Sequence, residues 1–359
     1  MSRFFSGKFK DLEAYTPGEQ PKDQKYIKLN TNESPFPPSP RVINAVSSEQ
    51  VQLLNLYPDP TVFSLASAIS DSCDLLPCNV AVGNGSDEIL AFVFNAFCDS
   101  ERGIAFPDVT YGFYPVFAKM FGVKYRTVPL DWELRINVDD YRDINDNVII
   151  ANPNAQTGIY LELSEIEKLV LQNPDRVVII DEAYIDFGGE SAAALIPKYD
   201  NLIVVRTFSK SRNLAGARLG FSLSCKELAN DINTMKYSFN PYSINRLSLI
   251  CGIEAMRDTG YMESCMERII ENRGFLTEKL EALGFQVLPS KANFVLARSN
   301  KISGKKLYEE LKKRGILVRY LGDKRIADYV RITVGTKEQM IALIFATVKI
   351  LESANDGIE

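Results

Sequence analysis

The sequence alternates short apolar runs with amphipathic stretches between about residues 40 and 258, and this alternation constrains the fold more than any other feature. An amphipathic stretch at 164–171 begins with Ser164 and has Glu167 three residues on, which predicts a helix start with a capping box. The apolar runs predict buried strands at 80–82, 104–106, 148–151, 177–180 and 202–205. Together they indicate an α/β fold in which helices cover both faces of a largely parallel sheet.

The 359 residues are more than one average domain needs, and the pattern changes near residue 259. A long helix is predicted from Met262 to Leu283, ending at Gly284, and a last helix starts at Thr336 with Gln339 completing a capping box. Further strands are predicted at 294–297, 316–319 and 329–334. We therefore expect an N-terminal arm over 1–40, a large domain over 41–258 and a small C-terminal domain over 259–359.

The chain contains no histidine, which narrows the chemistry available to it. Ser-His-Asp triads, Cys-His pairs and histidine-ligated metal sites are excluded, and we expect no metal. If the protein is an enzyme, its proton carrier must be Lys, Asp, Glu, Tyr or Cys, or a cofactor.

Charge, hydropathy and cysteine spacing limit the kinds of binding partner and the cellular location that we expect for this protein. With 41 basic and 46 acidic residues the formal charge is −5, which argues against nucleic-acid binding. The most apolar late stretch, 340–351, is too short to span a membrane, and the first 15 residues do not resemble a secretory signal. No cysteine pair has Cys-x-x-Cys spacing, so we expect reduced thiols in a cytoplasmic protein at Cys73, Cys78, Cys98, Cys225, Cys251 and Cys265.

Polar groups follow four of the predicted strands, at the edge where ligands of open α/β sheets bind. A glycine-rich segment at 83–88 leads into a helix and suits an anion, and an amide-rich loop occupies 152–158. Asp181 follows the third of these strands, and Lys210 follows the fourth. The four segments predict a single site.

A carboxylate, a lysine and an anion cradle are what pyridoxal 5'-phosphate requires. Lys210 could form the Schiff base and carry the proton, and Asp181 could keep the pyridine nitrogen protonated. Tyr111, in a loop after a strand, could stack on the ring. The expected phosphate ligands are Ser86, Asp87, Thr207, Ser209 and Arg218.

Seven motifs make the chain resemble the fold-type I pyridoxal-phosphate aminotransferases and, among them, the histidinol-phosphate aminotransferases. They are LNTNESP (29–35), YPDP (57–60), GSDE (85–88), TYG (110–112), DEAYIDF (181–187), TFSKS with LAGAR (207–218) and VRITVGT (330–336). The resemblance implies a large domain with a mostly parallel seven-stranded sheet and a smaller α/β domain.

The resemblance also implies roles at individual positions. Tyr184 would bind the phenolic oxygen of the cofactor, and Tyr57 would reach the phosphate site of a neighbouring subunit in a homodimer with shared active sites. Arg331 would bind the carboxylate of glutamate or 2-oxoglutarate. Arg319 and Tyr15 are candidates for contacting a phosphorylated substrate.

The chain departs from the family pattern in one loop. The family has an Asn-Pro-Thr-Gly sequence whose Asn contacts the phenolic oxygen, whereas this chain has Ala155 and Gln156 at the first two positions. Either Asn154 or Asn152 could supply the missing amide.

The implied reaction transfers an amino group between L-histidinol phosphate and 2-oxoglutarate, giving imidazole acetol phosphate and glutamate. Three alternatives remain: an aromatic or broad-range aminotransferase, a phosphothreonine-type decarboxylase, and a non-catalytic binding protein. The last is disfavoured because it would be expected to lose Lys210 or Asp181.

Overall fold

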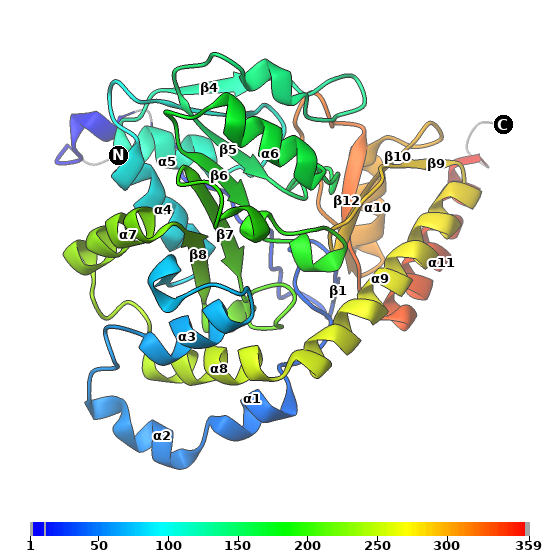
Figure 1. Cartoon of the computed structure of the whole chain (residues 1–359). Coiled ribbons are helices and arrows are strands. Elements are labelled where there is room, and N and C mark those ends of the chain that lie inside the picture. The colour runs from blue at the N-terminus through cyan, green and yellow to red at the C-terminus, as the bar shows by residue number, and fades with distance from the viewer. Residues whose placement is uncertain (1–2, 11, 356–359) are drawn as a thin grey trace.

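A seven-stranded sheet forms the centre of the protein in the computed structural model, which describes residues 3–10 and 12–355 (Figure 1). The strand order is β2-β8-β7-β6-β5-β3-β4, and β8 alone runs antiparallel to its neighbours β2 and β7. The fold predicted from the sequence is confirmed. The strands are β2 (Val80–Gly83), β3 (Ile104–Pro107), β4 (Tyr125–Val128), β5 (Asn147–Ala151), β6 (Val178–Asp181), β7 (Leu202–Thr207) and β8 (Gly220–Ser224).

Both faces of the sheet are apolar because the strands carry almost uninterrupted aliphatic sequence. Successive side chains point to opposite faces, so Ile149 and its register partners Ile179 and Ile203 enter one core cluster, while Val148 and Val178 enter the other. The first face is covered by α4 (Ser86–Phe97), α5 (Tyr114–Phe121) and α7 (Lys226–Phe239). The second is covered by α3 (Phe63–Asp71), α6 (Leu163–Gln172) and α8 (Arg246–Arg257).

The long helix α9 (Thr259–Ala282) runs from the end of α8 to a second sheet of order β12-β10-β9 (Figure 1). This antiparallel sheet packs with α10 and α11. The elements after α9 are β9 (Phe285–Val287), β10 (Phe294–Ser299), α10 (Gly304–Lys313), β11 (Ile316–Leu317), β12 (Tyr329–Thr333) and α11 (Lys337–Asn355). Near the N-terminus, β1 (Ile27–Lys28) pairs in parallel with β11, and α1 (Pro40–Ala45) and α2 (Ser48–Gln52) follow. Our division into an arm and two domains stays a prediction.

Local signals at helix ends were partly correct. The capping box before α11 is confirmed, because the Thr336 N–H donates to Gln339 Oε1 at 2.9 Å and the Gln339 N–H to Thr336 Oγ1 at 3.3 Å. The box expected at Ser164 is wrong: α6 begins one residue earlier, and its cap, Glu162, makes no side-chain capping bond. The strand expected over 316–319 is shorter, and Arg319 forms an isolated bridge to Arg331.

All six cysteines are free thiols. None of the helices within residues 3–10 and 12–355 combines the length and the apolarity needed to cross a membrane.

Candidate active site

A pocket of about 500 Å³ opens at the carboxyl ends of the large sheet's strands, between that sheet, the N-terminal arm and β12. Most of the residues singled out in the sequence line it, although they come from segments more than 300 residues apart. They are Tyr15, Ser86, Asp87, Tyr111, Asp181, Tyr184, Thr207, Ser209, Lys210, Arg218, Arg319 and Arg331.

The anion cradle forms because two glycines let the start of α4 approach β8 closely. A Cβ added to Gly220 would lie 2.2 Å from the backbone nitrogen of Ser86, so no other residue fits there without moving the helix. Gly85 has φ +86°, a conformation that glycine adopts readily, and directs the chain into α4. The N-terminus of α4 therefore points its free N–H groups and positive dipole end at the pocket.

Asp181 ends β6 and is buried, with 4% of its surface exposed. The Tyr114 hydroxyl donates a hydrogen bond to its Oδ2 at 2.8 Å, and the Ala183 N–H donates to its Oδ1 at 3.3 Å. Burial raises the pKa of Asp181 to about 6 although both donors favour the charged form. The carboxylate is therefore ready to stabilise a cation in the pocket.

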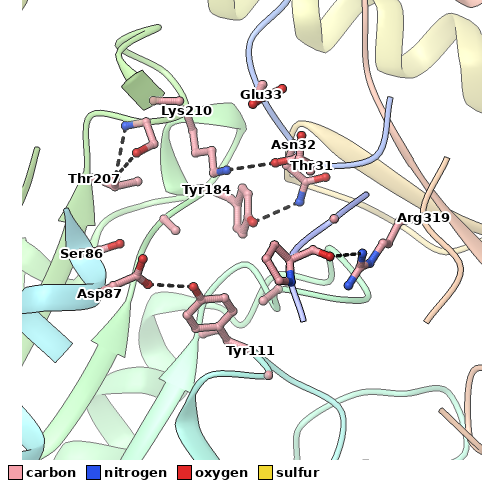
Figure 2. Close-up of a pocket in the computed structure, with 18 of the residues that line it drawn as sticks. Thr31, Asn32, Glu33, Ser86, Asp87, Tyr111, Tyr184, Thr207, Lys210 and Arg319 are labelled. Carbon is pink, nitrogen blue, oxygen red and sulfur yellow. Dashed lines mark hydrogen bonds between the residues drawn. The ribbon is translucent and has the colours of Figure 1, made fainter. Parts of the chain in front are cut away.

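Lys210 follows β7, and its side chain extends across the pocket towards the N-terminal arm (Figure 2). Its Nζ donates to the Thr31 carbonyl oxygen at 3.4 Å and lies 5.7 Å from the centre of the Tyr184 ring. Burial lowers the pKa of Lys210 to about 8, and the charge of Arg331 acts in the same direction. Near physiological pH the neutral form of the Lys210 amine is therefore a minority, but a much larger one than for an ordinary lysine.

Tyr184 is held between the arm and the second sheet. Asn32 Nδ2 donates a hydrogen bond to the Tyr184 hydroxyl at 3.0 Å (Figure 2). The Tyr184 ring packs edge-on against Phe294, with 5.2 Å between the ring centroids. Asn32 is itself fixed, because its Oδ1 accepts from Thr333 Oγ1 at 3.1 Å. The hydroxyl of Tyr184 thus has a defined direction.

Asp87 connects the ring-stacking and phosphate-binding candidates. It accepts a hydrogen bond from the Tyr111 hydroxyl at 2.7 Å (Figure 2) and one from Arg218 Nη2 at 3.3 Å. Nearby, Thr207 Oγ1 donates to Ser209 Oγ at 3.0 Å and accepts from the Ser209 N–H at 3.1 Å. Hydroxyl, guanidinium and helix N–H groups therefore gather at one end of the pocket.

Two arginines also line the pocket: Arg331 lies in β12, and Arg319 follows β11 and forms the isolated bridge to Arg331. Burial lowers the pKa of Arg331, whose guanidinium lies 5.1 Å from the centre of the Phe294 ring. Arg319 donates to the carbonyl oxygens of Thr16 and Pro17 at 3.1 and 3.2 Å, beside Tyr15. Two positive side chains thus line the same pocket as the amine and the carboxylate.

The structure does not place Asn154 in the pocket, contrary to our prediction. Its Nδ2 donates to the Val109 carbonyl, and its Oδ1 accepts from the N–H groups of Gln156 and Thr157. The Asn152 amide is likewise used, in two hydrogen bonds to the backbone of Leu161. Both asparagines use their amides to shape this part of the chain, and neither lines the pocket.

Tyr57 is also outside this pocket. It is 78% exposed, and its ring stacks on Tyr242 with 4.5 Å between the centroids. It is available to a neighbouring molecule.

Sequence reasoning missed two residues that orient the site, Asn32 and Tyr114, and gave Gln156 no role of its own. Asn32 lies in one of the motifs that carried the resemblance, and its left-handed φ of 55° is where asparagine is favoured. Tyr114 follows other aromatic residues in the sequence and resembles an ordinary core residue. The sequence contained no signal that it would reach Asp181.

The sequence model of the protein family described as aminotransferase class I and II matches residues 24–346 of this chain. The histidinol-phosphate aminotransferase of Brachyspira hyodysenteriae is 48% identical over 341 residues, covering 95% of this chain and 96% of the relative. The chain belongs to the histidinol-phosphate aminotransferases.

Solved structures of this family share the fold. The histidinol-phosphate aminotransferase of Clostridium acetobutylicum matches with a TM-score of 0.84 at 27% identity, covering 91% of this chain and 99% of that one. The Sinorhizobium meliloti histidinol-phosphate aminotransferase, solved in complex with pyridoxal-5'-phosphate, matches with a TM-score of 0.83 at 24% identity, covering 92% of each chain. The protein is an enzyme of the aminotransferase type.

Proposed function

We propose that this aminotransferase exchanges the amino group of L-histidinol phosphate with the keto group of 2-oxoglutarate, giving imidazole acetol phosphate and L-glutamate in histidine biosynthesis. The observation that carries the proposal is one pocket in which the Lys210 amine and the Asp181 carboxylate face Arg331 and Arg319. Each substrate of this reaction carries an anionic group, a phosphate ester or carboxylates, that an arginine can bind.

The pocket fits pyridoxal 5'-phosphate. The cradle around Gly220 and the α4 N-terminus suits its phosphate, and the raised pKa of Asp181 marks a buried carboxylate that gains from a cationic partner. When bound, the cofactor supplies an electron-withdrawing ring that stabilises negative charge on the substrate Cα. The residues proposed to hold it are Ser86, Asp87, Tyr111, Asp181, Tyr184, Thr207, Ser209, Lys210 and Arg218, with Tyr57 of a neighbouring subunit.

Lys210, Asp181 and Tyr184 would act on different atoms of the cofactor and substrate. Lys210 Nζ would hold the cofactor at its aldehyde carbon, and the Lys210 amine would move the proton at the substrate Cα. Its pKa of about 8 suits that proton transfer near neutral pH. Asp181 would keep the ring nitrogen protonated, and Tyr184, oriented by Asn32, would donate a hydrogen bond to the phenolic oxygen.

Alanine substitution should separate the roles of the two arginines. Arg331→Ala is expected to reduce kcat/KM for both glutamate and histidinol phosphate, whereas Arg319→Ala should affect histidinol phosphate more. A lost hydrogen bond to a charged group costs about 1.5–3 kcal/mol, or on the order of 10–100-fold at 1.4 kcal/mol per decade. Steady-state kinetics of the two half-reactions measure both effects.

Arg126→Ala is a suitable control, because Arg126 pairs with Asp146 on the exposed strand β4, away from the pocket. Equal changes for both substrates in Arg319→Ala would remove its proposed preference for phosphate. Wild-type activity on phenylalanine equal to that on histidinol phosphate would instead support a broad-range aminotransferase. Carbon dioxide release from phosphothreonine would support the decarboxylase.

We also propose a homodimer with shared active sites. Support comes from a cluster of exposed apolar side chains that lie close to Tyr57 in the sequence, because exposed apolar surface often marks a protein–protein interface. The cluster lies on α1, α2, the turn after α2 and the start of α3 and comprises Ile43, Val51, Leu54, Leu56, Tyr57 and Phe63.

Mixing two inactive variants, Tyr57→Ala and Lys210→Ala, should restore activity if Tyr57 acts across the dimer. Each mixed dimer then contains one site with both native residues. After random exchange in an equal mixture, about a quarter of all active sites are therefore native. Activity after co-refolding measures this, and mass spectrometry of the native dimers confirms that subunits exchanged. Exchange without recovered activity would place Tyr57 in its own subunit's site or outside any site.

A further inference from the structure

Gln156 connects three parts of the pocket. Its Oε1 accepts a hydrogen bond from Arg331 Nη1 at 2.9 Å, and its Nε2 donates to the Thr110 carbonyl oxygen at 3.1 Å. Arg331 Nη1 also donates to the Ala155 carbonyl oxygen at 2.9 Å. The loop after β5 thus accepts two hydrogen bonds from Arg331, one through the Ala155 backbone oxygen and one through the Gln156 side-chain oxygen. Gln156 is itself held by its hydrogen bond to Thr110, next to Tyr111 in the sequence.

These contacts determine which part of the guanidinium remains for a ligand. An Nη atom carries two hydrogens, and both hydrogens of Nη1 are taken by the loop oxygens. Nε is buried without a hydrogen-bond partner among the described residues. The guanidinium is therefore held in one plane, and an anion must bind through the Nε and Nη2 edge, which matches two carboxylate oxygens.

Gln156 alone among the side-chain amides of residues 152–158 lines the pocket. The amides of Asn152 and Asn154 are used by the loop backbone, and Ala155 ends in a methyl group. The orienting interaction with Arg331 therefore comes from Gln156, at a position where the family pattern has proline.

We propose that Gln156 is a positioning residue that determines specificity, fixing Arg331 so that it favours a planar carboxylate over a phosphate group. This rests on the proposed function, in which Arg331 receives the carboxylate of glutamate. A carboxylate needs the two N–H groups of the fork aligned with its plane, whereas the three oxygens of a phosphate can meet a loosely held guanidinium in several orientations. Releasing Arg331 should thus weaken carboxylate binding more than phosphate binding.

The experiment measures binding to the cofactor-loaded enzyme without turnover. Gln156→Met keeps the side-chain volume and removes both hydrogen-bonding groups. Calorimetric titration should show a dissociation constant for succinate raised on the order of 10-fold, the usual effect of one hydrogen bond to a charged group, and a change below about 3-fold for inorganic phosphate. Gln286→Met is the matched control, because Gln286 also accepts from an arginine, Arg298 at 2.7 Å, outside the pocket.

A second variant tests the same contact through charge. The charges of Arg331 and Arg218 lower the pKa of Lys210, and those of Glu33 and Asp87 raise it. The carboxylate introduced by Gln156→Glu would pair with Arg331 and so oppose the effect of Arg331 on the pKa of Lys210. In the loaded enzyme the Lys210 nitrogen would be bonded to the cofactor, and an added negative charge favours the protonated form of that nitrogen as well. The pH at which the visible band changes should therefore rise in Gln156→Glu and stay constant in Gln156→Met. Thermal melting confirms that each variant is folded.

The outcomes are separable from those of the proposed function. Unchanged succinate affinity in Gln156→Met, or equal weakening for succinate and phosphate, would overturn this inference whatever the wild type catalyses. A wild type that binds succinate but does not convert histidinol phosphate would contradict the proposed function and leave the role of Gln156 standing.

Discussion

Lys210→Ala is expected to lose transamination almost completely while the protein still binds pyridoxal 5'-phosphate. The variant retains the cradle at the start of α4, the Asp181 carboxylate and Arg218, so the noncovalent contacts to the cofactor persist. It lacks the amine whose pKa of about 8 suits proton transfer. The loss should exceed the roughly 10²–10⁴-fold typical of general acid–base catalysis, because the covalent attachment is lost as well. Single-turnover kinetics and dialysis of bound cofactor measure the two properties separately.

Borohydride reduction of the wild type tests the same residue chemically. Mass spectrometry should locate the reduced cofactor adduct on Lys210. Lys236 is an internal control, since burial lowers its pKa to about 8 as well, but it lies in α7 and does not line the pocket. An adduct on Lys236, or normal turnover by Lys210→Arg, would contradict the assignment.

Asp181→Asn is expected to reduce turnover strongly and to stabilise the cofactor-free protein. Breaking one side of a buried ion pair costs about 3–5 kcal/mol, or roughly 10²–10⁴-fold at 1.4 kcal/mol per decade. Folding raises the pKa of Asp181 from 3.8 to about 6, so the folded state binds its proton more tightly than the unfolded chain. The free energy of unfolding therefore falls as the pH rises from about 4 through 6, and asparagine removes that loss.

Kinetics of the loaded enzyme and melting of the cofactor-free protein at pH 8 measure these opposite effects. Tyr114→Phe is the companion variant: it keeps the carboxylate and removes one donor, so its effect on turnover should be smaller, on the order of 10-fold. Near-normal turnover in Asp181→Asn would remove the carboxylate from the mechanism. A lower melting temperature for the cofactor-free Asp181→Asn protein would contradict the proposed cost of its charge.

The sequence predicted the buried strands well and missed those that lack a continuous aliphatic pattern. β6 and β7 are buried on both faces of the sheet, and strands of this kind have nearly continuous aliphatic sequences. Such a run of aliphatic residues is visible in the sequence. β8 was missed because Gly220, Ser222 and Ser224 alternate with its apolar residues although the whole strand is buried. β4 was missed because three of its four side chains are exposed at the edge of the sheet.

The candidate site was predictable where a residue follows a strand and less so where side-chain direction matters. Asp181 and Lys210 line the pocket because the carboxyl ends of parallel strands meet at one edge. Asn154 stands in the same loop as Gln156, yet its amide turns into the loop while that of Gln156 faces Arg331. The direction of each amide depends on the local backbone turn and on hydrogen-bond partners distant in the chain. Residue type and spacing do not reveal that direction.

The contact between the arm and the second sheet has a consequence for how the enzyme matures in the cell. Asn32 and Thr333 are 301 positions apart, and their hydrogen bonds help to fix Tyr184 in the pocket. The strands of the large sheet end at Ser224, so that sheet could form while the ribosome is still translating the remainder. The complete binding pocket can form only after β12 has been translated, because contacts between residues so far apart in the chain form late in folding. A nascent chain stalled before β12 should therefore protect its large sheet from proteolysis yet lack Arg331 and the Thr333 contact that fixes Asn32, and so bind a carboxylate such as succinate poorly.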